Sequence, residues 1–162
     1  MAGLTSLGIF HTAIALIALF SGFGALFRYR EISPSNGLGL IYLVTTFTSA
    51  ATGLGIFRHG GFGPPHILSI MTLVALSIGL VASKTQVFGR ASRIVQALSF
   101  SSTFLFHMIP GFTESLTRLP VGSPLLPSAE APEFKIIYGV LLVIFGSGLF
   151  LQLRWLRRQR AV

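Results

Sequence analysis

The sequence predicts an all-α integral membrane protein, a single bundle of five transmembrane helices with the N-terminus outside and the C-terminus in the cytoplasm. Three observations predict it. Of the 162 residues, 52% are hydrophobic and only 10% are charged, whereas soluble domains carry about 25% charged residues. The apolar residues fall into five stretches, each long enough to cross a hydrocarbon core of about 30 Å. Basic residues gather at the ends of these stretches, as they do in multi-pass membrane proteins.

The expected spans cover about residues 7–27, 37–56, 66–83, 93–110 and 136–153, in one domain, 1–162. The first stretch has no basic leader, so it is interpreted as a span and not as a signal peptide. A charged turn with one proline follows it, and a glycine–proline break at 57–65 precedes the third span, where Pro65 suits the first helical position. A basic loop precedes the fourth span. Four prolines predict that the outer connection, 111–135, is not helical.

The basic residues fix the predicted orientation. The second and fourth connections hold three of them, Arg58, Arg118 and Lys135. The first and third connections and the C-terminal tail hold nine: Arg28, Arg30, Lys84, Arg90, Arg93, Arg154, Arg157, Arg158 and Arg160. The positive-inside rule places the nine in the cytoplasm. Five crossings give the same result, an outer N-terminus and an inner C-terminus.

With this orientation all four histidines, His11, His59, His66 and His107, lie toward the outer side. Imidazole binds metals and protons near neutral pH, and polar groups in a bilayer are often functional. We therefore expect His11, His66 and His107 to converge, with Glu114 and Arg118 at the mouth of the bundle. His59 lies in a glycine-rich turn that positions it poorly.

Polar and small residues mark the faces that should pack inward. The fourth span carries a polar stripe at helical spacing: Gln96, Ser99, Thr103 and His107. The first carries small residues in line with His11: Ala15, Ala18, Gly22 and Ala25. The second offers Thr45, Ser49 and Thr52 on one face. Small residues let helices approach closely and hydroxyls bond across them. The fifth span, with three glycines, is expected to be peripheral.

Several functions remain open for the histidines. Haem b needs axial imidazoles on facing helices, which His11 and His107 can supply, with His66 as a substitute. A divalent metal can be held by His11, His66, His107 and Glu114. Proton or solute transport would use His107 and Glu114. The structural alternative is a non-catalytic or accessory subunit of a membrane complex, in which the histidines only bond neighbouring helices. No residue is assigned a catalytic role.

The sequence also limits the chemistry and the partners. Cysteine is absent, so no disulfide or thiolate metal site can form. No basic stripe is interleaved with aromatics, which argues against nucleic acid. The expected partner is the lipid bilayer, and a redox site would also need a quinone or another membrane protein. Glu114 and Arg118 have the spacing of a helix-surface ion pair.

Two sequence blocks carry a family resemblance. They are Gly61-Phe-Gly-Pro-Pro-His-Ile-Leu-Ser-Ile-Met-Thr-Leu73 and Phe106-His-Met-Ile-Pro-Gly-Phe-Thr-Glu-Ser-Leu-Thr-Arg-Leu-Pro-Val-Gly122. They resemble a family of uncharacterised bacterial multi-helix membrane proteins, over the first four spans and the outer loop. The resemblance singles out His11, His66, His107, Glu114 and Arg118 and implies a bacterial inner membrane, but it brings no activity. The layout is also loosely similar to small b-type cytochrome bundles.

Overall fold

The computed structural model describes residues 5–57 and 61–159. In that part of the chain the regular structure is entirely helical. The elements are α1 (Ser6–Tyr29), α2 (Gly37–Gly53), α3 (Pro64–Lys84), the short 3-10 helix η1 (Gly89–Ala91), α4 (Ser92–Arg118) and α5 (Glu133–Gln159). The all-α prediction is confirmed.

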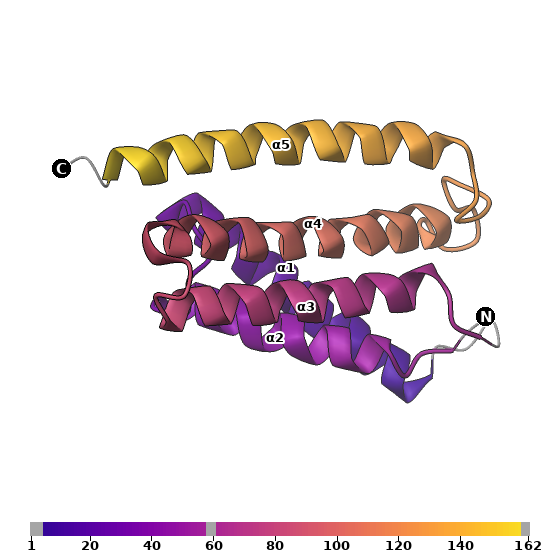
Figure 1. The fold of residues 1–162 in the computed structure, drawn as a ribbon. Coiled ribbons are helices and arrows are strands. Elements are labelled where there is room, and N and C mark those ends of the chain that lie inside the picture. Colours follow the sequence, from indigo (N-terminus) through magenta and orange to yellow (C-terminus); the bar gives the residue numbers. More distant parts are fainter. Residues whose placement is uncertain (1–4, 58–60, 160–162) are drawn as a thin grey trace.

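Successive helices run in opposite directions, so the connections between them lie at two opposite ends of the bundle (Figure 1). One end carries the start of α1, the start of α3 and the connection between α4 and α5. The opposite end carries the α1–α2 turn, the α3–α4 turn and the end of α5. We call the second the arginine-rich end, because its basic residues are Arg28, Arg30, Lys84, Arg90, Arg93, Arg154, Arg157 and Arg158.

Packing joins α1 closely to α2 and α3 to α4, and α2 also packs against α3. The core contains Tyr42 and Phe100, both fully buried, together with Ala18, Ala25 and Leu76. Small residues on α1 make this possible, as the sequence predicted. Helix α5 lies at the edge of the bundle, alongside α4 (Figure 1), in agreement with its expected peripheral position.

Side-chain caps define where two helices begin. The Thr5 hydroxyl accepts the N–H of Gly8 at 3.1 Å, and the Asn36 carbonyl oxygen accepts the N–H of Gly39 at 2.8 Å. These bonds satisfy amides that have no partner within the helix. Helix α1 ends at Tyr29. The next residue, Arg30, has a positive φ of 61°, in the left-handed region, and its N–H donates to the Leu26 carbonyl at 3.0 Å.

Helix boundaries differ from several of the expected spans. Helix α2 ends at Gly53, three residues early, and α5 (Glu133–Gln159) extends beyond both ends of its span. The expected non-helical connection began at residue 111, but α4 continues through Pro110 to Arg118. Proline removes one backbone bond, here the one to the Phe106 carbonyl, and helices within a bundle tolerate this loss. Helix α3 begins at Pro64, two residues before the expected start, so that Pro64 takes the position expected for Pro65.

Three helices, α1, α3 and α5, are long and apolar enough to cross a membrane, which indicates a membrane protein. The other two expected spans do not meet these conditions. Helix α2 is apolar but has only 17 residues, about 26 Å at the usual rise. Helix α4 has 27 residues, and the polar residues of its stripe lower the mean hydropathy of the helix.

Candidate functional site

Polar side chains lie inside the bundle along one face of α2. Tyr42, Thr46, Ser49 and Gly53 recur at spacings of three and four, and all are buried. A face built this way would be costly against lipid, but it can bond to neighbouring helices. Hydrogen bonds and ring contacts join six polar residues across α1, α2 and α4. We call this set the polar seam: His11, Tyr42, Thr46, Thr52, Thr103 and His107.

His11 of α1 contacts the last turn of α2. Its Nδ1 lies 3.1 Å from the Thr52 hydroxyl oxygen. That hydroxyl donates its own proton to the backbone, with oxygens of Thr48 and Ser49 at 2.8 and 3.0 Å. With the Thr52 proton on the backbone, its oxygen can accept from Nδ1 of His11, and in that tautomer the lone pair of the neutral ring is on Nε2.

Gly53 allows α1 and α3 to approach α2 at this level. A Cβ atom at this position would lie 2.7 Å from the Ser69 hydroxyl and 3.3 Å from Cε1 of His11. The first distance is shorter than real Cβ contacts, so with a larger residue the Ser69 side chain would have to move. The second is a tight contact, so Gly53 leaves room for the His11 ring.

His107 of α4 lies deeper along the same face of α2. Its Nε2 is 3.2 Å from the Thr46 hydroxyl, and its ring meets Tyr42 edge-on, with centroids 6.2 Å apart. The side chain is 9% exposed and Thr46 is fully buried. His11 of α1 and His107 of α4 therefore both contact α2, through threonine hydroxyls six residues apart on that helix.

The third, His66, has a different set of contacts at the start of α3. Its Nδ1 accepts the N–H of Gly63 at 3.2 Å, which caps the helix. Its ring stacks on Phe62 and makes a tilted contact with Phe57, with centroids at 5.2 and 4.6 Å. Among the residues that the structure describes, no three His, Asp or Glu side chains form a group able to hold a metal ion. His59 lies outside the described residues.

Glu114 and Arg118 form the ion pair that their spacing predicts. The Arg118 Nε and a Glu114 carboxylate oxygen are 2.6 Å apart, four residues apart on α4. Both side chains are well exposed to solvent, at 37% and 56%, so the pair contributes little to stability. It lies on the last turns of α4, beyond the polar seam.

The sequence identified part of this seam. Thr103 and His107 of the expected stripe are buried, and Ala18, Gly22 and Ala25 of α1 are buried as well. On α2 two of the three expected residues lie on the inner face, because Ser49 is buried and Thr52 contacts His11. The third, Thr45, is more exposed and bonds its own backbone. Tyr42 and Thr46, which were not proposed, also form inner contacts. Their spacing of four from each other was the available signal.

Comparisons with protein-family models, with curated proteins and with solved structures find no match. The functional argument therefore rests on the geometry of the polar seam.

Proposed function

We propose that the chain is a five-span integral membrane protein of a bacterial inner membrane, and that it binds haem b for electron transfer through His11 and His107. The topology has the N-terminus outside and the C-terminus inside. Alternating helix directions and the charge bias support it. Helices α2 and α4 cross as well, because the helices that pack around them cover their polar faces.

The contact between Nδ1 of His11 and the Thr52 hydroxyl is the observation that carries the haem proposal. Histidines that bind haem iron commonly do so through Nε2 while the other ring nitrogen donates to a nearby oxygen. The bond from Nδ1 to Thr52 already supplies that second interaction. His107 lies on another helix of the bundle and bonds a hydroxyl of α2. Its ring would exchange that bond for the iron.

The number of available ligands favours haem over a divalent metal. The metal set expected from the sequence was His11, His66, His107 and Glu114. A protein zinc site needs three or four such ligands, whereas haem needs two axial ones because the porphyrin supplies the rest. Two neighbouring imidazoles fit the second requirement. A quinone or another membrane protein would exchange electrons with the haem.

A second candidate function is that of a non-catalytic subunit. Each imidazole of the pair already has a threonine hydroxyl as partner, so the seam is complete as a set of interhelical hydrogen bonds. Such bonds stabilise membrane bundles without a ligand.

Visible spectroscopy of detergent-purified protein, after incubation with haem, tests the proposal. We expect reduced-minus-oxidised Soret and α bands at one haem per chain. His11→Ala and His107→Ala should each abolish or shift the bands, because an axial ligand is lost. His66→Ala is the matched control and should leave the spectrum unchanged. A protein that stays colourless, or bands that survive both substitutions, would support the non-catalytic subunit.

A further inference from the structure

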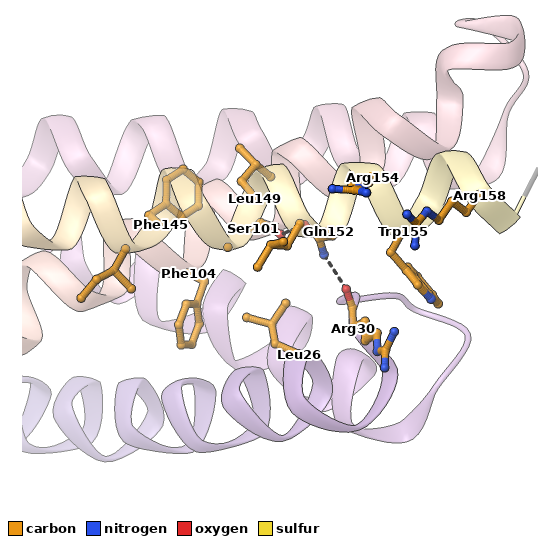
Figure 2. Close-up of a pocket in the computed structure, with 13 residues that line it drawn as sticks. Leu26, Arg30, Ser101, Phe104, Phe145, Leu149, Gln152, Arg154, Trp155 and Arg158 are labelled. Atoms are coloured by element: carbon orange, nitrogen blue, oxygen red, sulfur yellow. Dashed lines mark hydrogen bonds between the residues drawn. The ribbon is translucent and has the colours of Figure 1, made fainter.

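A second site, whose lining includes none of the histidines, is a cavity between α1, α4 and α5. Its volume is about 660 Å³, within the range of small-molecule sites. Figure 2 shows the side chains that line it, with Phe104, Phe145 and Leu149 along most of its length and Arg154, Trp155 and Arg158 at the arginine-rich end. We propose that this cavity binds an anionic phospholipid, with an acyl chain along the apolar wall and the phosphate at the arginines.

The polar groups of the wall are already satisfied by one another. The buried Gln152 of α5 donates from Nε2 to the Arg30 carbonyl at 2.8 Å. Its Oε1 accepts the hydroxyl proton of Ser101, also at 2.8 Å. No polar group of this trio needs a ligand. The remaining wall is hydrocarbon and aromatic, which suits an acyl chain better than a polar metabolite.

The charge at the mouth identifies the lipid class. Arg154 and Arg158 are one turn apart on α5, and Arg30 completes the group from the end of α1 (Figure 2). All three are exposed. Arginine guanidinium groups match the geometry of a phosphate, which they can bind through two parallel hydrogen bonds. Basic pockets of this kind between membrane helices bind the headgroups of anionic lipids.

The acids near this end do not neutralise these arginines. Eight described basic residues belong to the arginine-rich end, against one acid, Glu31. Glu31 is engaged elsewhere, since its Oε1 lies 3.1 Å from Nη2 of Arg93 on α4. The excess positive charge at the mouth is therefore complementary to a lipid phosphate.

Trp155 gives a direct measurement, because it is the single tryptophan of the chain and lines the cavity. The purified protein is reconstituted in vesicles of phosphatidylcholine that contain a small fraction of brominated phospholipid, whose acyl chains quench tryptophan on contact. We expect brominated phosphatidylglycerol to bind at the site more than ten times as tightly as brominated phosphatidylcholine. Each arginine near an anionic headgroup raises the affinity about fivefold, and the mouth has more than one. About 1 M salt should remove the preference, because it shortens the Debye length to about 3 Å.

Two pairs of variants separate the cavity from a general surface effect. Arg154→Gln with Arg158→Gln should lower the preference to about fivefold, the contribution of the remaining Arg30. Arg157→Gln, on the same helix but outside the cavity lining, should leave most of it. Gly148→Leu should exclude both lipids, because Gly148 lines the cavity and a Cβ there has no neighbour within 4 Å. Gly139→Leu has equal room outside the cavity and should change nothing.

Other occupants give different results, and each overturns the inference. A neutral isoprenoid lipid would be extracted from the purified protein in stoichiometric amount, and both phospholipids would then quench equally. A second copy of the chain would shield Trp155 from both lipids until the protein is diluted in the bilayer. Equal losses for Arg157→Gln and the double variant would reduce the effect to surface charge.

Discussion

Tyr42 of α2 donates its hydroxyl proton to Thr103 of α4 across an oxygen–oxygen distance of 2.7 Å. The direction follows because Thr103 uses its own proton on the Phe100 carbonyl, at 2.7 Å. Both side chains are completely buried. This bond lies next to the edge-on contact between Tyr42 and His107, so the packing core and the polar seam share one residue.

Replacing Tyr42 with Phe should lower the free energy of unfolding by about 1 kcal/mol, the usual size of such a bond between membrane helices. The cost stays modest because Thr103 keeps its bond to the backbone. Reversible unfolding in mixed micelles measures it. Tyr29→Phe removes a hydroxyl from a half-buried ring and is the control, with an expected change near zero. Equal stabilities for Y42F and wild type would show that the bond contributes nothing.

Gly79 sets the distance between α3 and α4. A Cβ atom there would overlap the ring of Phe100, which is itself fully buried. Gly79→Ala should therefore lower the free energy of unfolding by roughly 1–3 kcal/mol, the range for overpacked cores.

A double substitution checks this explanation for Gly79. Phe100→Leu removes the part of the ring that the new methyl group meets, so it should cost less in the Gly79→Ala background than in wild type. Gly146→Ala is the control for glycine itself, since no atom lies within 4 Å of a Cβ there. It should leave the free energy of unfolding unchanged or raise it by up to about 1 kcal/mol. Additive costs would contradict the overlap.

Gln152 holds the edge helix α5 to the rest of the bundle at the arginine-rich end. Gln152→Leu should leave the Ser101 hydroxyl and the Arg30 carbonyl without their partner, at roughly 1–3 kcal/mol for each buried group. We expect faster amide exchange in the second half of α5, measured by mass spectrometry, while α1 and α2 stay unchanged. Gln159→Leu, at the exposed end of α5, should not change the exchange. Uniform exchange across all helices would indicate global destabilisation instead.

The sequence predicted the number and order of helices because apolar runs, prolines and capping residues act locally. It also placed Thr103 and His107 on an inward face. On α2 the choice between Thr45 and Thr46 was harder to predict, because the two residues are chemically identical neighbours. What decides it is Tyr42, which packs against Gly22, where a Cβ would lie 2.8 Å from the tyrosine ring.

His66 shows a second limit of sequence reasoning. Its position at a helix start was predicted, but its function there depends on Phe57 and Phe62, whose rings contact the imidazole. Likewise Gln152 gave no sequence signal beyond being one amide in an apolar helix. Its partners lie 51 and 122 residues away in the chain, and only the packed structure brings them together.

Absence of cysteine from the sequence makes the proposed topology easy to test. Four exposed positions lie in the connections and accept single cysteines without background: Ser35, Gly61, Thr85 and Ser123. A membrane-impermeant maleimide added to intact cells should label Gly61→Cys and Ser123→Cys. Ser35→Cys and Thr85→Cys should react only after permeabilisation, because each lies one crossing away. The reverse pattern would invert the orientation. Labelling of Thr85→Cys and Ser123→Cys from the same side would mean that α4 does not cross, and Ser35→Cys with Gly61→Cys tests α2 in the same way.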